Sequence, residues 1–182
     1  KILSKRYKKV SIANIKNKND LQKLVKRKPD LVFSGVKYFL FGKEKIWLND
    51  YLEMYKIPYI ASSKSALDNE SDKNKAKKII RLAKIKTADF FTTYPNEHLE
   101  TKSIPISFPL FIKPVKGGDS RGIDSSSIVN NFDSFKKKVL EIKENLNLNS
   151  IAETYLTGRE YSVGIFEESI TGILRALPIE IV

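Results

Sequence analysis

The sequence contains no cysteine, which excludes both a disulfide framework and a cysteine-ligated zinc site. It also has no run of about 18 to 20 apolar residues, the length that a helix needs to cross a bilayer. The opening segment, residues 1–10, is basic but lacks the apolar stretch of a signal peptide. We therefore expect a cytoplasmic protein that does not bind a membrane.

Histidine is also scarce, since His98 is the only one in the chain. It lies in a polar segment beside Glu97, Glu100 and Lys102, and no serine or metal-ligating residue stands at a meaningful spacing from it. We expect His98 to be a surface residue, and we predict no metal ligand in the chain.

Acidic residues are outnumbered, because 33 Lys and Arg face 21 Asp and Glu, which gives a net charge of +12. Such an excess is compatible with nucleic acid, an anionic surface or a phosphorylated small molecule as the partner. Most of the cations are lysines scattered among asparagine and isoleucine, and no nucleic-acid recognition motif accompanies them. A solvated basic surface is favoured, and a basic nucleic-acid-binding protein stays open as the alternative.

The length of 182 residues and the 41% hydrophobic content suit one large domain or two small ones. The chain begins at Lys1 and stops at Val182, directly after an apolar run. We expect a fragment of a longer protein.

The first third of the chain alternates short apolar runs with helical patterns. Apolar runs at residues 10–15, 31–33 and 57–60 read as strands, and the apolar spacing at 21–25 and 46–55 is that of helices. Asn19 and Asp20 are candidates for the cap of the first helix. This order predicts a doubly wound α/β layer over residues 1–62.

The remainder predicts an α+β domain with an antiparallel sheet. After a polar stretch at 62–72, Asp72 can cap a helix over 73–84, and a second helix is expected over 132–144. The short strands expected here cover residues 110–112, 127–129, 151–152, 161–166 and 170–174. We place one domain at 63–166 and the start of another at 167–182.

A glycine-rich basic loop carries the clearest chemical signal. An apolar strand delivers Lys113, and the loop from Lys116 through Gly117 and Gly118 to Gly122 follows it. Glycine lets backbone N–H groups approach phosphate oxygens, and a lysine on a strand supplies a fixed positive charge. Taken alone, the same residues are also typical of an ordinary turn.

Lys113-Pro114 and the following Gly118-Asp119-Ser120-Arg121-Gly122 resemble a feature of the ATP-grasp superfamily. The D-alanine:D-alanine ligases of that superfamily carry a lysine-proline pair followed by a mobile glycine-serine loop. The resemblance implies that Lys113, Lys116, Gly117, Gly118 and Ser120 bind ATP, with Ser120 and Arg121 in catalytic positions.

Two further segments stand in the family's order. Asp72-Lys73 with Lys77 is similar to the family's aspartate-lysine pair and its ATP-contacting lysine, although the segment alone would read as a solvated helix face. Residues 151–164 resemble the strand that meets the nucleoside. The resemblance implies that Glu153, Thr154, Tyr155 and Leu156 contact the adenine and that Glu160 takes the ribose hydroxyls. Each glutamate alone would read as a solvent-facing residue.

The resemblance implies a pre-ATP-grasp doubly wound βαβ layer, followed by an ATP-grasp central domain with an antiparallel sheet. It further implies an ATP-dependent carboxylate–amine ligase of the peptidoglycan-precursor type that works through an acyl phosphate, with amino-acid-like substrates and a homodimer. Mg²⁺ ligands are expected outside this chain, which alone should be inactive.

The sequence departs from the family in two places. Asp119 replaces a loop serine, and residues 38–46 keep only a glycine and a glutamate of the family's first-domain segment. A ligase for a different amino acid or peptide, and a nucleotide-binding fragment without activity, therefore stay as alternatives.

Overall fold

The computed structural model describes residues 2–168 and 171–181. The chain divides into two compact units, Lys1–Ala76 and Lys77–Val182, and each is described by itself. The domain limits expected at 62 and 166 stay predictions.

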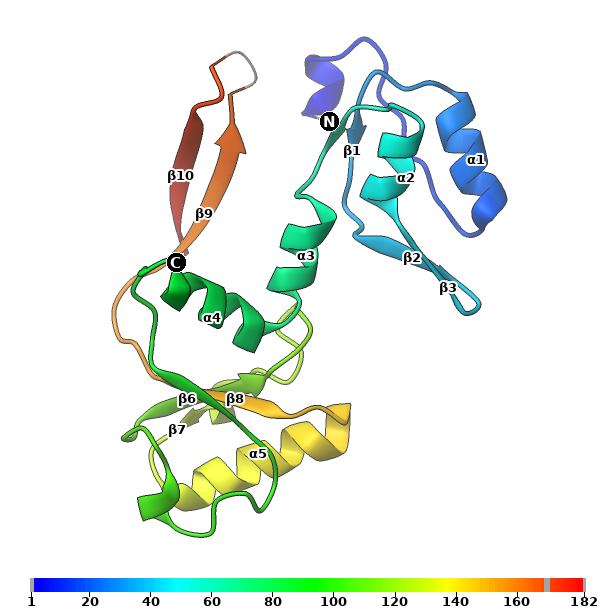
Figure 1. The fold of residues 1–182 in the computed structure, drawn as a ribbon. Coiled ribbons are helices and arrows are strands. Elements are labelled where there is room, and N and C mark those ends of the chain that lie inside the picture. Colours follow the sequence, from blue (N-terminus) through cyan, green and yellow to red (C-terminus); the bar gives the residue numbers. More distant parts are fainter. Residues whose placement is uncertain (1, 169–170, 182) are drawn as a thin grey trace. The chain divides into compact units, whose positions relative to one another are not determined.

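The first unit contains one parallel strand pair and an antiparallel hairpin (Figure 1). Val32 of β1 pairs with Tyr59 of β4, as expected for a βαβ connection. The elements are η1 (Leu3–Lys5), α1 (Lys18–Lys26), β1 (Val32–Phe33), β2 (Tyr38–Phe41), β3 (Glu44–Trp47), α2 (Leu48–Met54), β4 (Tyr59–Ile60) and α3 (Lys64–Glu70). Its core is formed by leucine, valine and isoleucine side chains from α1, from α2 and from the segment before β4, namely Leu21, Val25, Leu48, Leu52 and Ile57.

Three expectations for this unit are wrong. Residues 10–15 form no strand, because no described strand pairs with them, and Ile12 is 95% exposed. The cap of α1 is Asn17, whose side chain accepts a hydrogen bond from the Asp20 N–H at 3.0 Å. The helix expected from 46 begins only at Leu48, since Ile46 pairs with Phe39 across the β2–β3 hairpin.

The second unit is built on an antiparallel sheet, as expected, and the sheet has four strands in the order β5-β8-β6-β7. Its elements are α4 (Lys73–Leu82, which begins in the first unit), β5 (Phe90–Thr93), η2 (Thr101–Ser103), β6 (Leu110–Pro114), η3 (Ser125–Ser127), β7 (Ile128–Val129), α5 (Phe132–Leu146), β8 (Ser150–Thr154), β9 (Glu160–Glu167) and β10 (Leu174–Ile181). Strands β9 and β10 pair with each other along their whole length.

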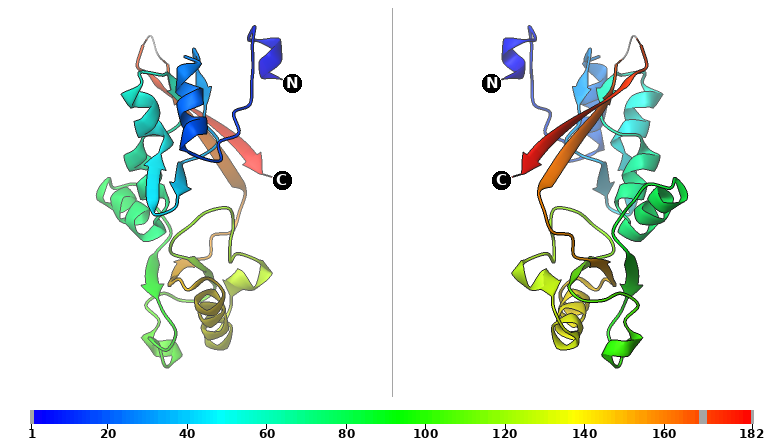
Figure 2. Two further views of the ribbon diagram at one scale, coloured as in Figure 1. Left: turned by 90° about the vertical axis from the view of Figure 1, so that its right-hand side faces the viewer. Right: turned by 90° about the vertical axis from the view of Figure 1, so that its left-hand side faces the viewer.

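Helix α5 covers one face of this sheet, as both Figure 1 and Figure 2 show for the yellow helix beside β6 and β8. Asn131 caps the helix and accepts a hydrogen bond from the Ser134 N–H at 2.9 Å. The helix and three strands share a core of Leu110, Ile112, Val129, Phe135, Val139, Ile142 and Ala152. Burial of these apolar side chains orients the sheet, because alternate residues of each strand must point toward α5.

Helix α4 matches the expectation, and Asp72 caps it by accepting a hydrogen bond from the Lys75 N–H at 3.1 Å. The strand expected at 170–174 is wrong in its position, since β10 begins at Leu174. Residue 170 lies outside the described residues. Helix α3 was not expected at all, because its segment is polar, but Ser63 caps it by accepting from the Ala66 N–H.

Candidate functional site

The face of the sheet opposite α5 carries a row of side chains from three strands. Residues that pair directly across an antiparallel sheet point to the same face. Glu153 in β8 pairs with Phe90 in β5 and with Phe111 in β6, so these three residues form one row. Lys113 lies two residues after Phe111 and therefore points to the same face.

Glu153 is the centre of a cluster of three charged groups. Its Oε2 atom lies 3.3 Å from Lys77 Nζ, and its Oε1 atom lies 2.9 Å from Lys113 Nζ. The Lys113 contact is an ion pair whose angles fall outside those of a hydrogen bond. The side chains of Glu153, Lys77 and Lys113 are only 10%, 11% and 20% exposed. We call these three residues the charge cluster.

The ammonium group of Lys77 has a second acceptor, because it donates a hydrogen bond of 2.7 Å to the hydroxyl of Thr87. Burial lowers the pKa of Lys77, and the positive charges of Lys113 and Arg81 lower it further, while the Glu153 carboxylate acts in the opposite direction. A lysine held in this way keeps a fixed position and a reduced proton affinity.

Aromatic rings support the cations. Lys77 Nζ lies 5.2 Å from the centroid of Phe90, and the Arg81 guanidinium carbon lies 4.2 Å from the same ring. Lys113 Nζ lies 5.6 Å from the centroid of Phe111. These cation–π contacts fix the positive groups of α4 and β6 over the sheet.

The glycine-rich loop is exposed and turns tightly. Asp119 and Ser120 both have positive φ, at 57° and 54°, and the Arg121 N–H donates to the Gly118 carbonyl at 3.3 Å. Within the described residues, no hydrogen bond or ion pair joins Ser120 or Arg121 to the charge cluster. The structure therefore brings Lys77, Lys113 and Glu153 together but leaves the predicted catalytic pair in the exposed loop.

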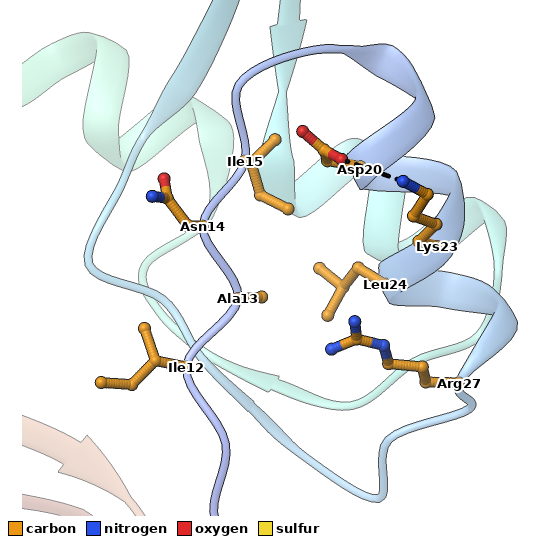
Figure 3. A pocket seen from close by; sticks show the side chains of 8 residues that line it. All are labelled: Ile12, Ala13, Asn14, Ile15, Asp20, Lys23, Leu24 and Arg27. Carbon is orange, nitrogen blue, oxygen red and sulfur yellow. Dashed lines mark ion pairs between the residues drawn. The ribbon is translucent and has the colours of Figure 1, made fainter.

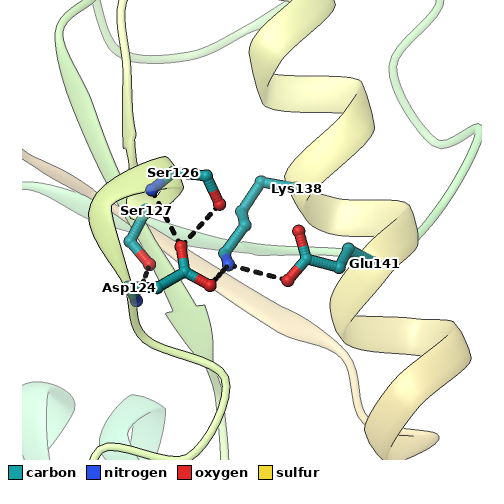
Figure 4. A network of polar contacts seen from close by, with 5 residues as sticks. All are labelled: Asp124, Ser126, Ser127, Lys138 and Glu141. Carbon is teal, nitrogen blue, oxygen red and sulfur yellow. Dashed lines mark hydrogen bonds and ion pairs between the residues drawn. The ribbon is translucent and has the colours of Figure 1, made fainter.

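A buried lysine ties the end of this loop to α5 (Figure 4). Lys138 Nζ lies 2.9 Å from Asp124 Oδ2 and 3.0 Å from Glu141 Oε1, and the Lys138 side chain is 1% exposed. Hydrogen bonds from the hydroxyl and backbone N–H of Ser126, together with the hydrogen bond from Lys138, lower the pKa of Asp124 to about 2.

Burial lowers the pKa of Lys138, but its hydrogen bonds to Asp124 and Glu141 outweigh burial, so the pKa is raised. This network is not evident from the sequence, because a lysine on a helix reads as solvated. A usable signal was the spacing of Asp124 and Ser127. These two residues form a capping box in which the Asp124 N–H donates to Ser127 Oγ at 3.1 Å.

The remaining predicted nucleotide contacts follow β8. Thr154 ends the strand, and the Tyr155 N–H donates to the Pro109 carbonyl at 3.1 Å. Leu156 is 69% exposed. Glu160 is exposed at the first position of β9. No hydrogen bond or ion pair between these side chains and the charge cluster occurs in the part of the chain that the structure describes.

The prediction for His98 is wrong in part. The residue is half-buried rather than on the open surface, and its ring contacts Phe91 and Phe135 at centroid distances of 5.4 and 6.0 Å. These edge contacts on the α5 side of the sheet give His98 a packing role.

A small hollow of about 80 Å³ lies in the first unit beside α1 (Figure 3). An ion pair of 3.5 Å between Lys23 and Asp20 closes one side of it, and the Lys16 N–H lowers the pKa of Asp20. Its lining consists of Ile12, Ala13, Asn14, Ile15, Asp20, Lys23, Leu24 and Arg27. With one carboxylate already paired, the hollow offers little chemistry.

Comparison with known proteins shows the family to which the chain belongs. No protein-family model matches the sequence. The D-alanine–D-alanine ligase of Leptospira interrogans is 32% identical over 159 residues, which cover 82% of this chain and 43% of the relative. The chain is a D-alanine:D-alanine ligase-like member of the ATP-grasp superfamily.

Solved structures agree in fold. The D-Ala:D-Ser ligase VanG of Enterococcus faecalis is 26% identical with a TM-score of 0.60, over 81% of this chain and 41% of that one. The D-alanine–D-alanine ligase of Bacillus anthracis complexed with ATP is 23% identical with a TM-score of 0.57, over 91% and 57%. The resemblance predicted from the sequence is thereby confirmed, and the chain spans about half the length of the curated relatives it matches.

Two features are absent from the residues that the structure describes: a cluster of metal-ligating side chains and a helix able to span a membrane. Residues 2–168 and 171–181 hold no group of three or more histidine, aspartate or glutamate side chains that could bind a metal ion. None of the helices in these ranges has the length and apolar character that spanning a membrane requires.

Proposed function

We propose that this chain binds the phosphates of ATP at the charge cluster and serves a D-alanine:D-alanine ligase-like enzyme that joins a carboxylate to an amine. The observation that carries the proposal is the convergence of Lys77, Lys113 and Glu153 on one sheet face from α4, β6 and β8. Two fixed, poorly solvated ammonium groups are suited to polyphosphate, because charge interactions strengthen as water is excluded.

In this proposal the other predicted residues complete the nucleotide site. The exposed loop, with Lys116, Gly117 and Gly118, would cover the phosphates through its backbone N–H groups. Ser120 and Arg121, the two residues in catalytic positions of this loop, would also lie beside the phosphates. Thr154, Tyr155 and Leu156 would lie against the adenine, and Glu160 would accept from the ribose hydroxyls.

The proposed reaction transfers the γ-phosphoryl group of ATP to a substrate carboxylate. An amine then attacks the acyl phosphate, and the amide forms with release of ADP and phosphate. This chain would contribute positioning and charge neutralisation, which are the main sources of catalysis in phosphoryl transfer. Since the resemblance implies that the Mg²⁺ ligands lie outside this chain, we derive no step through that ion.

A ligase for a different amino acid is the second candidate. The observation in its favour is the first-unit segment 38–46, which forms most of the β2–β3 hairpin and keeps only Gly42 and Glu44 of the family's segment. The similarity to a D-Ala:D-Ser ligase is compatible with either candidate. Product analysis of the whole enzyme with a panel of D- and L-amino acids separates them. The homodimer and the cytoplasmic location stay predictions.

The test of the nucleotide site is calorimetric titration with ATP and with adenosine. Lys113→Met keeps the length of the side chain but removes its charge, and we expect ATP affinity to fall by about tenfold or more, equivalent to about 1.4 kcal/mol. Adenosine has no phosphate, so its affinity should change little. The matched control is Lys102→Met, at an exposed position of η2, which should leave both affinities unchanged.

Equal ATP affinity in the wild type and in Lys113→Met would refute the assignment. The nucleic-acid alternative makes the opposite prediction, namely steeply salt-dependent binding of unrelated oligonucleotides and indifference to ATP.

A further inference from the structure

The carboxylate of Glu153 is shared between two lysines. Each of its two oxygens faces a different ammonium group, Oε2 that of Lys77 at 3.3 Å and Oε1 that of Lys113 at 2.9 Å. The two lysines belong to elements far apart in sequence, and within the charge cluster Glu153 is the group that links them. If Glu153 served only to contact the adenine, its carboxylate would not need to lie between the two lysines.

We propose that Glu153 is a positioning residue whose carboxylate is the shared counter-ion that holds Lys77 and Lys113 together before nucleotide binds, and that polyphosphate then takes over as their counter-ion. This inference rests on the proposed function and deepens it. It assigns the charge cluster to the phosphate part of the nucleotide rather than to the nucleoside part.

Burial makes a counter-ion necessary at this position. Two ammonium groups, 11% and 20% exposed, repel each other and are poorly solvated, so without an anion one of them would lose its proton or move into solvent. A carboxylate between the two ammonium groups offsets their repulsion and replaces part of their lost solvation. Its own 10% exposure means that water screens the ion pairs only weakly.

Hydrogen-bond capacity leaves room for the phosphate. An ammonium group has three donors. Lys77 directs them to Thr87 and Glu153, which leaves one for a ligand. Among the described residues Glu153 is the one carboxylate or hydroxyl partner of Lys113, beside its cation–π contact with Phe111, so Lys113 keeps more of its donors for a phosphate oxygen.

The exchange of counter-ions predicts a change in the pH dependence of ATP binding. The charged groups around Lys77 are Arg81 on the same helix, Lys113 on β6 and Glu153 on β8, and only the last raises its pKa. Glu153→Gln removes that charge, so the pKa of Lys77 falls further. Because ATP needs the protonated lysine, the alkaline loss of ATP affinity should begin at lower pH in the variant.

The experiment is calorimetric titration of the wild type and of Glu153→Gln with ATP and with adenosine across neutral and alkaline pH. Glutamine keeps an oxygen that accepts from the adenine amine, so adenosine affinity should stay within about twofold. The ATP profile of Glu153→Gln should be displaced to lower pH. Glu144→Gln is the matched control, since that carboxylate is exposed on α5, which covers the opposite face of the sheet from the charge cluster, and its ATP profile should keep the wild-type pH dependence.

The outcomes are distinguishable. An ATP profile of Glu153→Gln that superimposes on the wild-type profile overturns the inference and leaves the nucleotide site standing. Absence of ATP binding by the wild-type chain overturns the proposed function itself.

A measurement on the wild type serves if Glu153→Gln does not fold. Selective ¹³C labelling at lysine Cε follows the titration of Lys77 by nuclear magnetic resonance, with and without ATP. Bound polyphosphate adds negative charge beside the ammonium group, so its titration should move to higher pH. A titration that ATP leaves unchanged would overturn the inference.

Discussion

Three glycines of the glycine-rich loop differ in what a methyl group would meet. A Cβ atom on Gly118 would have no atom within 4 Å, and the φ of this residue is not positive. Gly117 has open space but a φ of +95°. Gly122 has a φ of +74°, and its Cβ would lie 2.9 Å from both Leu146 Cδ1 and Pro114 Cγ. The three alanine substitutions therefore separate backbone strain from steric overlap.

The expected magnitudes follow from these two causes. Forcing a side chain into the left-handed region costs about 1–2 kcal/mol, which is the whole effect expected for Gly117→Ala. Gly122→Ala adds an overlap of about 1–3 kcal/mol, for a total of about 2–5 kcal/mol. Leu146 can rotate away, but the ring of Pro114 is buried in β6 and cannot. Gly118→Ala should stabilise by about 0.4–1 kcal/mol, since alanine restricts the unfolded chain.

The assay is urea unfolding followed by far-ultraviolet circular dichroism, with the slope against denaturant checked for constancy. We expect stability to fall in the order Gly118→Ala, wild type, Gly117→Ala, Gly122→Ala. If Gly122→Ala proved no more destabilising than Gly117→Ala, the close approach of the loop to Pro114 would be wrong.

Two further substitutions test the polar contacts. Thr87→Val removes the hydroxyl that accepts from Lys77 and should destabilise by about 1–3 kcal/mol, because a poorly exposed ammonium group loses one of its two acceptors. Thr92→Val at an exposed position of β5 is the control for the unfolding measurement, with an expected change within about 0.5 kcal/mol. For Asp124, whose pKa is about 2, the ionised form stabilises the fold above its unfolded pKa of about 4 and this contribution is lost as pH falls toward 2. The difference in unfolding free energy between wild type and Asp124→Asn should therefore shrink over that interval, and a constant difference in urea titrations at each pH would contradict the linkage.

Elements with a strong local signal were predictable from the sequence. The apolar run at residues 110–112 and the capped pattern after Asp72 each lie in a strand or helix of the expected kind, because pattern and burial agree there. The β2–β3 hairpin was not predictable in the same way. Its strand Tyr38–Phe41 is an unbroken aromatic and apolar run, and only pairing with Glu44–Trp47 shows it to be half of a hairpin.

The segment at residues 10–15 shows the opposite error. Its composition is that of a strand, but a strand forms only where a neighbour supplies hydrogen-bond partners, and no described strand pairs with this segment. The burial of Lys138 was unpredictable for a related reason. Two carboxylates compensate its charge, one of them from η3's cap Asp124, and their proximity exists only in the folded unit.

The charge cluster could be recognised only from the sequence resemblance and the structure together. Taken alone, Lys77 and Glu153 each read as solvent-facing, and the loop that follows Lys113 read as an ordinary turn. The resemblance to a ligase family was what grouped the three residues. The structure adds that all three are largely buried on one sheet face. For stability alone, apolar side chains of similar size would serve that face as well or better, because the desolvation of charges offsets much of their attraction. A stability requirement therefore does not account for three charges at this position, whereas the binding of a polyanion does.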